Sequence, residues 1–449
     1  MCFAIVLAAL VAWPSIGYSG GAPECPWAPA PHQNIKTVID IDNVWTGTRV
    51  DFAAAKNNDR FVIGYYNQDR WLTVVTAAES GVIKRHLLDT RFAGWDSHNS
   101  VALAIDRNGL LHVAANMHAT KLNYFRAAAP DQAPAKVEMM QDDNDLVTYP
   151  QFLKTSDGDL LFIFRSGRSG DGRWKVRRWD GRSWSNVGNG PILSDRGFGG
   201  RVSGYPSRFF IGSDQNIHLA IVWRLSADAA TNVRLSYAKT RDFVTWFDSR
   251  GRRLADPLSP ESAETVLHTG PNAGLLNNAK VSINPQGRPV IVFTRQNEQG
   301  HNTVELAVSD QGRWQIVPVA VSDRGIPVRG LGSLPETVAL SEVDFRAPDR
   351  PRLTFRFPGL ATTQQILDPK TLAPACVEKP SPDPAATFIK PSIPTMKPQL
   401  LRVGQQATFV WSAQPANNDT RRACTADAPR ACDPPASPLR LLINAPGAN

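Results

Sequence analysis

The chain has 449 residues, of which 42% are hydrophobic and 20% are charged. This balance excludes a largely disordered chain, and beyond the N-terminus no segment reaches the roughly 20 apolar residues of a membrane span. The net charge of +8 and the pI of about 9.3 favour acidic partners, such as an anionic polysaccharide, nucleic acid or a membrane surface, or else serve solubility alone. No Lys/Arg block or aromatic-interleaved RNA motif occurs, which makes nucleic acid the weaker choice.

The first 21 residues have the pattern of a secretory signal peptide. An apolar run extends from Cys2 to Trp13, and small residues follow, with Ser19 or Gly21 as the last residue before cleavage. Because the first three residues carry no basic side chain, a buried N-terminal strand or a misplaced start codon is the alternative. We expect an exported protein, secreted or periplasmic, that does not stay with the membrane after cleavage.

The cysteines favour disulfides over a metal site. Cys2 lies in the predicted signal peptide, and the spacing of the other cysteines contains no CxxC pattern. The remaining cysteines are Cys25, Cys376, Cys424 and Cys432. Pairing of the last two would close a short loop, and pairing of the first two would join the ends of a ring. Three pairings are possible, and the sequence does not choose among them.

A hairpin signal recurs about every 50 to 70 residues, near or somewhat above the spacing of propeller blades. In each copy an apolar strand runs into a turn rich in Asp, Asn and Gly, and a second apolar strand follows. The copies lie at 58–63, 106–111, 156–161, 213–218, 284–289 and 348–353. The pattern predicts an all-β fold, namely a β-propeller.

Further turns support this fold. Residues 309–314 match the Asp-box of sialidase-like propellers, residues 240–246 are a looser relative, and residues 179–184 join two strands. In an Asp-box the Asp and Gly shape a turn and the Trp packs between sheets, so the motif indicates a fold and not catalysis.

The hairpin copies, with residues 45–52 and the region after Phe355, predict a seven-bladed ring. We expect the propeller to cover residues 22–380. Residues 381–449 are rich in Pro, Ala, Asn and Asp and are expected to form a tail or small appended segment, with one strand-like stretch at 406–411.

Four hairpins place polar pairs at similar distances from their turns. Opposed residues of an antiparallel hairpin have a constant index sum, about 216 for the turn near Asn108 and about 314 for the turn at Asp157. The expected pairs are His98 with His118, Tyr149 with Arg165, Tyr205 with Trp223 and Arg224, and Asn277 and Asn278 with Arg295 and Gln296. If these hairpins hold the inner strands, the pairs converge on one face of the ring, near the central channel.

Each pair also has a purely structural interpretation. The two histidines would then be hydrogen-bonded beneath loops, and Arg165 would be a buried ion-pair partner. His112 lies close to its turn and is expected to be structural. The functional interpretation depends on the fact that all four pairs lie at a similar distance from their turns.

His, Tyr and Arg without two catalytic carboxylates fit ordinary glycoside hydrolysis poorly. They suit β-elimination on a uronic acid, which needs a cation to neutralise the carboxylate, a base for the α proton and an acid for the leaving oxygen. Arg grips carboxylates in a bidentate fork, His titrates near neutrality, and a Tyr beside an Arg can relay protons.

Four stretches, 95–100, 116–118, 148–152 and 164–170, resemble the BNR-repeat (Asp-box) propeller family, which includes the seven-bladed ulvan lyases. The resemblance covers about residues 45 to 360. It implies that His98 and Tyr149 are the proton-transfer pair, with either one as the base. It further implies that Arg165 neutralises the uronate, and that His118 assists or positions it.

The expected substrate-binding residues are Tyr205, Asn99, Arg168, Arg224, Asn278 and Arg295. Some relatives carry a structural metal. In this chain, residues 26–375 contain no Cys, and His218, His268 and His301 show no tight ligand spacing. We therefore expect no metal and no cofactor.

The leading hypothesis is an exported, monomeric polysaccharide lyase that cleaves an ulvan-like, uronate-containing polysaccharide by β-elimination. A sialidase-like hydrolase is suggested by the Asp-boxes, but it would need an arginine triad, a Tyr/Glu nucleophile pair and an Asp acid. The sequence shows no early Phe/Tyr-Arg-Ile-Pro motif. A non-catalytic sugar-binding propeller is the third hypothesis.

Overall fold

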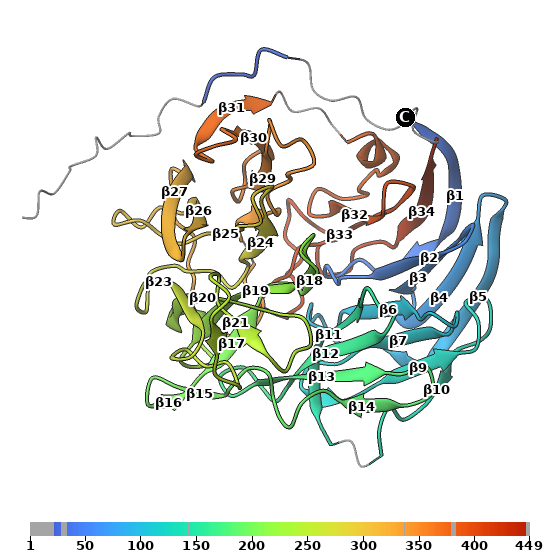
Figure 1. Ribbon diagram of the computed structural model, residues 1–449. Coiled ribbons are helices and arrows are strands. Elements are labelled where there is room, and N and C mark those ends of the chain that lie inside the picture. Colours follow the sequence, from blue (N-terminus) through green and yellow to red (C-terminus); the bar gives the residue numbers. More distant parts are fainter. Residues whose placement is uncertain (1–21, 28–33, 142–143, 336, 379–382, 446–449) are drawn as a thin grey trace, which may run out of the picture.

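The computed structural model describes residues 22–27, 34–141, 144–335, 337–378 and 383–445. Within these ranges the regular elements are β-strands and two short 3₁₀ helices, η1 (Ala229–Thr231) and η2 (Pro384–Phe388). Seven sheets with four or more strands surround a central axis (Figure 1), and we refer to them as blades. The prediction of an all-β propeller is confirmed.

Consecutive strands pair antiparallel within each blade, because short turns join them. One blade contains β2 (Ala53–Asn57), β3 (Arg60–Tyr66), β4 (Trp71–Ala78) and β5 (Gly81–Arg91). The next contains β6 (Val101–Ile105), β7 (Leu111–Ala115), β9 (Tyr124–Ala127) and β10 (Ala135–Lys136). The third contains β8 (Thr120–Lys121), β11 (Leu146–Lys154), β12 (Leu160–Ser166), β13 (Arg173–Trp179) and β14 (Trp184–Asn186).

Three further blades follow in chain order. The largest contains β17 (Ser203–Pro206), β18 (Phe210–Ile211), β19 (Ile217–Arg224), β20 (Asn232–Thr240), β21 (Trp246–Phe247), β22 (Arg253–Leu254) and β23 (Glu264–His268). The others contain β24 (Lys280–Ile283), β25 (Pro289–Phe293), β26 (Thr303–Asp310) and β27 (Arg313–Val321), and β28 (Ala339–Leu340), β29 (Arg352–Arg356), β30 (Thr363–Leu367) and β31 (Pro374–Glu378). A separate hairpin is formed by β15 (Arg196–Gly197) and β16 (Gly200–Arg201).

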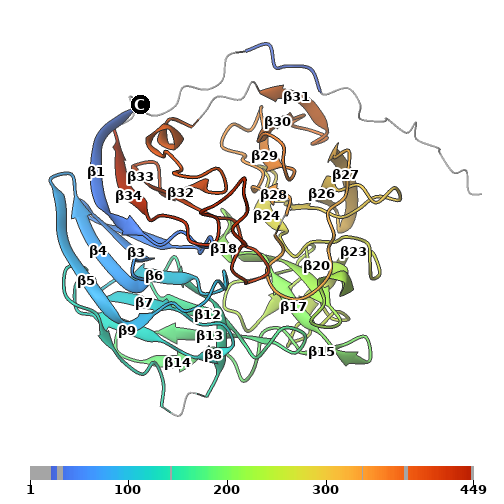
Figure 2. The same ribbon diagram turned by 180° about the vertical axis from the view of Figure 1, so that it is seen from behind.

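The last blade joins the two ends of the chain. Its strands, in spatial order, are β1 (Ile35–Val44), β34 (Ser437–Asn444), β33 (Ala407–Ala413) and β32 (Lys397–Val403). The blue β1 lies beside the red β34 in Figures 1 and 2. This pairing closes the ring, because the two ends of the chain share one blade.

The expected tail is therefore wrong, since the propeller extends past residue 380 and uses the C-terminal segment for three strands of one blade. The C-terminal segment joins the propeller because its apolar strand β33 is buried along its whole length. Trp411 of this strand stacks on Phe52 of the adjacent blade at a centroid distance of 4.8 Å. The Pro- and Asn-rich composition belongs to the connections between these strands. The strand expected at 406–411 is β33.

Apolar side chains between adjacent blades form the core. The Trp314 of the Asp-box packs on Tyr237 of the neighbouring blade, at 5.5 Å between ring centroids, as the motif predicts. Two disulfides, Cys25–Cys376 and Cys424–Cys432, are present in the part of the chain that the structure describes. These are one of the three pairings that the sequence allows.

The predicted signal peptide, residues 1–21, lies outside the described residues. Within the described ranges, the structure has no helix with the length and apolar character needed to span a membrane.

Candidate functional site

The hairpin of β6 and β7 brings His98 and His118 together. Val101 pairs with Ala115, which gives the predicted index sum, and the two histidines follow just beyond the paired strands. Their rings stack at a centroid distance of 4.1 Å and an interplanar angle of 22°. The predicted juxtaposition of the two histidines is confirmed.

A carboxylate that the sequence analysis missed binds both rings. Asp96 Oδ1 lies 2.7 Å from His98 Nδ1, and Asp96 Oδ2 lies 2.5 Å from His118 Nδ1. Burial alone would raise the pKa of Asp96, but the hydrogen bonds from His118 and His98 hold it well below its usual range. Because an ionised carboxylate only accepts, both Nδ1 atoms donate to it. Both Nε2 atoms are then left without a partner among the described residues.

Among the described residues, the same three side chains form a group that could hold a metal ion. The ligand atoms of Asp96, His98 and His118 lie within 4.8 Å of one another. Two imidazoles and a carboxylate are ligands that zinc and other transition metals accept. The sequence analysis had considered only other histidines, so the absence of a metal stays a prediction. The spacing Asp-x-His in residues 96–98 was the available signal.

Tyr149 is placed by a bulge in β11. Gln151 pairs with Ile163, as the index sum of 314 predicts, but the register then shifts so that Thr148, not Tyr149, pairs with Arg165. Tyr149 occupies the bulge with a φ of 56°. The two predicted partners still meet, since Arg165 Cζ lies 4.9 Å from the centre of the Tyr149 ring. The Tyr149 ring also lies 5.5 Å from the His98 ring. The bulge thus aims the phenol at the histidines.

The environment of Tyr149 keeps its phenol protonated. Burial raises the pKa of Tyr149 to about 12, against the opposing effect of the nearby Arg165 guanidinium. Its ring lies parallel to that of Trp174, 6.0 Å away. At neutral pH the side chain can therefore donate a proton but does not lose one spontaneously.

Arg165 is a buried cation whose described partners are neutral. Only 1% of the residue is exposed, and its Nη2 donates to Thr148 Oγ1 at 3.2 Å. The Arg165 side chain packs against Gly172, where a Cβ would lie only 2.5 Å from Arg165 Cδ. No carboxylate of the described residues is within ion-pair distance. A buried charge without a partner is costly, so this arrangement suits an anion supplied by a ligand.

A second Tyr–Arg pair occupies the next blade. Tyr205 pairs with Val222, not with Trp223 or Arg224 as predicted, because the register changes by one residue between β18 and β17. Arg224 nevertheless reaches Tyr205, with its Nη1 donating to the phenol oxygen at 3.2 Å and its Cζ 4.2 Å from the ring centre.

The other partners of Arg224 are neutral as well. Its Nε donates to Asn232 Oδ1 at 2.7 Å, and its Nη2 donates to Asn277 Oδ1 at 3.2 Å. Ser169 Oγ is hydrogen-bonded to Tyr205 at 2.7 Å and links this pair to the Arg165 blade. The site therefore contains two neighbouring buried guanidinium groups.

The remaining predicted substrate-binding residues are not part of this group. Asn99 is buried and donates to Asp96 O, so it supports the histidine loop. The Asn278 amide donates to Val338 O, and Arg295 forms an ion pair with Glu305 at 3.1 Å. Arg168 is exposed, and its backbone N–H binds Asp171 Oδ1.

A cavity of about 440 Å³ lies among the inner strands of the ring. Tyr149, Tyr205 and Asn277 line it together with residues of β2, β6 and β32. The two tyrosines thus face the central channel, whereas His98, Arg165 and Arg224 contact these rings and do not themselves line the cavity. We refer to the end of the channel beside His98 as its mouth.

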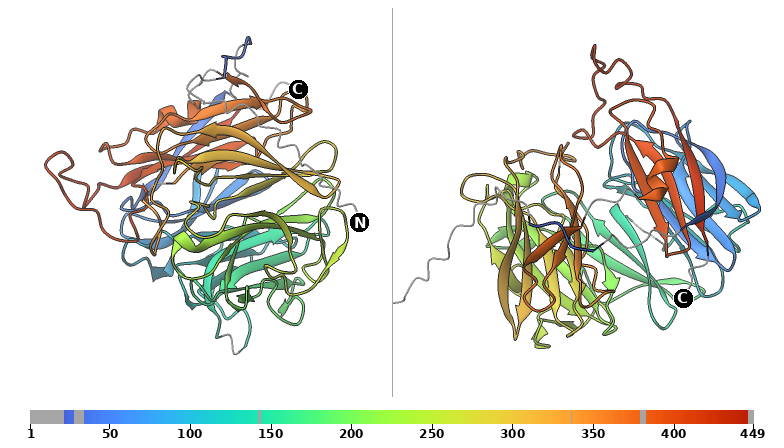
Figure 3. Two further views of the ribbon diagram at one scale, coloured as in Figure 1. Left: turned by 90° about the vertical axis from the view of Figure 1, so that its left-hand side faces the viewer. Right: turned by 90° about the horizontal axis from the view of Figure 1, so that it is seen from above.

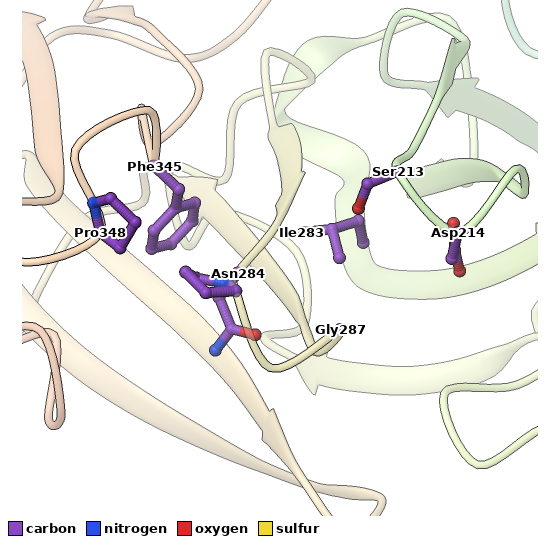
Figure 4. A pocket seen from close by; sticks show the side chains of 8 residues that line it. Ser213, Asp214, Ile283, Asn284, Gly287, Phe345 and Pro348 are labelled. Carbon is purple, nitrogen blue, oxygen red and sulfur yellow. The ribbon is translucent and has the colours of Figure 1, made fainter.

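A second hollow of about 410 Å³ lies at the hairpin turns around Asp214 and Asn284 (Figure 4). Its one acidic residue, Asp214, is already bound to His218 Nε2 at 2.9 Å. Its other lining residues are Ser213, Ile283, Asn284, Pro285, Gly287, Phe345 and Pro348. Its lining contains no basic side chain, so we take the mouth, with its histidines and arginines, as the candidate site.

Fold and site together define a propeller with a cluster of His, Tyr and Arg at one end of its channel. The chain belongs to the BNR repeat-containing family, whose model matches residues 61–322. The family resemblance inferred from the sequence is thereby confirmed. No curated protein sequence matches the chain.

Solved structures share the fold. The chain is similar to the crystal structure of the polysaccharide lyase Uly1, with 14% identity, a TM-score of 0.57 and coverage of 88% of this chain and 90% of that one. It is also similar to a PL25 ulvan lyase, with 12% identity, a TM-score of 0.57 and coverage of 85% and 92%. A structure of such a lyase bound to -[GlcA(1-4)Rha3S]- matches with 12% identity, a TM-score of 0.54 and coverage of 85% and 92%.

Proposed function

We propose that this protein is an exported polysaccharide lyase that cleaves a uronate-containing, ulvan-like polysaccharide by β-elimination. The observation that carries the proposal is that Tyr149, which lines the cavity, contacts both His98 and Arg165, and that Arg165 is buried without a carboxylate partner among the described residues. A uronate carboxylate supplies the missing anion, and the two neighbouring side chains supply the proton transfers.

In this mechanism Arg165 binds the uronate carboxylate and makes the C5 proton acidic. His98, whose Nδ1 donates to Asp96, takes that proton on Nε2. The electron pair of the broken C–H bond forms the C4–C5 double bond, and the glycosidic C4–O bond breaks. Tyr149 gives its proton to the departing oxygen, because its raised pKa keeps the phenol protonated until then. The products are an unsaturated uronate and a shortened chain with a free hydroxyl.

His118 has a supporting role in this scheme. It shares Asp96 with His98 and stacks on its ring, so it fixes the orientation of the base. Tyr205, one blade further on, lines the cavity and binds the neighbouring part of the substrate, and the buried Arg224 behind it adds a positive charge.

The properties of the whole chain support this substrate class. A net charge of +8 favours an anionic polymer, and a fold neighbour is bound to a glucuronate-containing saccharide. The two disulfides fit an oxidising compartment, which supports a secreted or periplasmic location. We expect the protein to act as a monomer.

The test is incubation with ulvan and a panel of other uronate polymers, following the ultraviolet absorbance of the unsaturated product. We expect activity with at least one polymer and its loss in His98→Ala and Tyr149→Phe. His301→Ala, a half-buried histidine in another blade, is the control and should remain active.

Three results would contradict the proposal. They are no absorbance from the folded protein with any polymer, full activity in both site variants, or binding of an acidic glycan without turnover. The last result would assign the chain as a sugar-binding propeller, and release of free sialic acid would assign it as a hydrolase.

A further inference from the structure

The connection between β33 and β34, residues 414–436, crosses one face of the ring toward its centre (Figure 2). We call it the C-terminal loop. Seen from the side and from above, it projects beyond the sheets (Figure 3). It belongs to the segment that the sequence predicted as a tail, so its position over this face was not expected.

Asp419 in this loop joins two other loops. Ser97 N–H donates to Asp419 Oδ1 at 3.3 Å, and Ser333 N–H donates to Asp419 Oδ2 at 3.2 Å. The hydroxyls of Ser97 and Ser333 are hydrogen-bonded to each other at 2.5 Å. Ser97 precedes the β6 blade and Ser333 precedes the β28 blade, while Asp419 belongs to the closing blade. The three segments thus form a bridge between distant blades.

The bridge ends beside the proposed base. Asp419 Oδ2 lies 3.5 Å from His98 Nδ1, and both side chains are largely covered, with exposed fractions of 17% and 15%. His98 Nδ1 is therefore flanked by two carboxylates, those of Asp96 and Asp419. Asp419 also holds the backbone of the residue immediately before His98.

The local backbone is adapted to this contact. Asn418 and Asp419 have φ values of 50° and 58°, a left-handed conformation that Asn and Asp adopt more readily than most residues. Gly332 has a φ of 78°, and a Cβ at this position would lie 3.0 Å from Asp419 Oδ2. A side chain at position 332 would therefore press on the carboxylate.

Contacts within the C-terminal loop give it a defined shape. The Cys424–Cys432 disulfide closes its outer part. Arg422 donates to the carbonyl oxygens of Pro415 and Ala416, each at 3.0 Å. Arg421 lies over Trp95, three residues before His98, with its Cζ 5.5 Å from the ring centre. The loop is thus anchored on both sides of Asp419.

We propose that Asp419 is a positioning residue, which the C-terminal loop carries across the ring to hold the Ser97–His98 segment and the His98 ring in register with Tyr149. This inference rests on the proposed function for its catalytic consequence only. Asp419 contacts the base and not the substrate, so its loss should lower kcat and leave KM nearly unchanged.

The first experiment compares Asp419→Ala with Asp427→Ala. Asp427 is an exposed carboxylate of the same loop, so its variant matches the change of charge without the contacts. We expect kcat to fall roughly 10- to 100-fold in Asp419→Ala, with KM within about two-fold, because small displacements of a catalytic group have effects of this size. Asp419→Asn keeps an acceptor for one backbone amide and should lose less.

The second experiment leaves every functional side chain in place. Gly332→Ala and Gly330→Ala both put a Cβ at a positive φ in the connection between β27 and β28. Only the Cβ at position 332 would contact Asp419, since a Cβ at position 330 would have no neighbouring atom within 4 Å. We expect Gly332→Ala to lower kcat and Gly330→Ala to act like the unchanged protein. Equal kcat values in the two variants would overturn the proposal, once melting curves show that both are folded.

A third measurement does not depend on any reaction. In protein labelled with ¹⁵N in its histidine rings, the ring signals of His98 are assigned by their absence in His98→Ala. These signals should move in Asp419→Ala and Gly332→Ala and stay in place in Asp427→Ala and Gly330→Ala. If they do not move in Asp419→Ala, the positioning role is wrong. If they move while no polymer is cleaved by the unchanged protein, the positioning role holds and only the proposed function fails.

Discussion

Two pairs of histidines occupy opposite ends of the same kind of hairpin. His98 and His118 lie at the mouth, partly exposed, with both Nδ1 atoms bound to one carboxylate. His112 and His218 lie near the turns, each at most 1% exposed. Their Nδ1 atoms bind tyrosine hydroxyls on the neighbouring strand, His112 to Tyr124 at 2.7 Å and His218 to Tyr237 at 2.6 Å.

The difference shows how position along a hairpin separates chemistry from scaffold. Burial lowers the pKa of His112 to about 4 and also lowers that of His218, so both rings stay neutral inside the fold. The mouth histidines instead leave both Nε2 atoms without a partner among the described residues. The same residue type therefore stabilises blades at one end and is available for proton transfer at the other.

The largest effect is expected from removing the proposed acid. Tyr149→Phe deletes one oxygen and should lower kcat/KM roughly 10³-fold, within the range of general acid–base catalysis. Tyr124→Phe is its counterpart at the buried end, where the hydroxyl is hydrogen-bonded to His112 and Trp184. It should lower the melting temperature and leave kcat/KM unchanged. Steady-state kinetics and thermal melts distinguish these outcomes, and a reversal of the two results would remove the distinction between the two ends.

Asp96→Asn should have the next largest effect. The amide cannot accept from both Nδ1 atoms with the strength of a carboxylate, so His98 and His118 lose their common anchor. We expect kcat to fall about 10²-fold, at the low end of the range for general acid–base catalysis, because the base is retained and the amide oxygen can still accept from one Nδ1 atom. Asp214→Asn, at the buried His218, should leave kcat unchanged. Equal losses in the two variants would contradict a catalytic role for Asp96.

The buried histidines predict how stability depends on pH. The pKa of His112 is lowered from 6.5 to about 4 in the folded state. Between these pH values the unfolded chain therefore binds a proton that the folded chain does not. Its contribution is complete above pH 6.5 and is lost as the pH falls toward 4, by on the order of 3 kcal/mol. Melting temperatures over this window should fall less steeply in His112→Gln. The lowered pKa of Asp96 adds a separate loss only below about pH 4.

The sequence predicted the propeller and the meeting of His98 with His118, because a regular hairpin keeps its index sum. It missed the pairing of Tyr149 and Tyr205 by one residue. A bulge and a register change are local backbone events that leave no mark on alternating hydrophobicity. It also missed Asp419, since a contact between residues 322 positions apart depends on how the ring closes. The proline-rich connections hid the apolar strands that close it.

The smallest effect separates two arginines that the sequence treated alike. Arg224 is buried among neutral partners, whereas Arg295 is already paired with Glu305. Arg224→Gln should raise KM for an anionic polymer about 10-fold, since a charge-assisted hydrogen bond contributes on the order of 1.5 to 3 kcal/mol. Arg295→Gln should change KM by less than about two-fold, because the Glu305 carboxylate already satisfies that guanidinium. Kinetics at several salt concentrations test this pair. The salt dependence of KM should become weaker in Arg224→Gln and stay unchanged in Arg295→Gln. A larger effect at Arg295 would place the substrate over the β24 blade instead of the β17 blade.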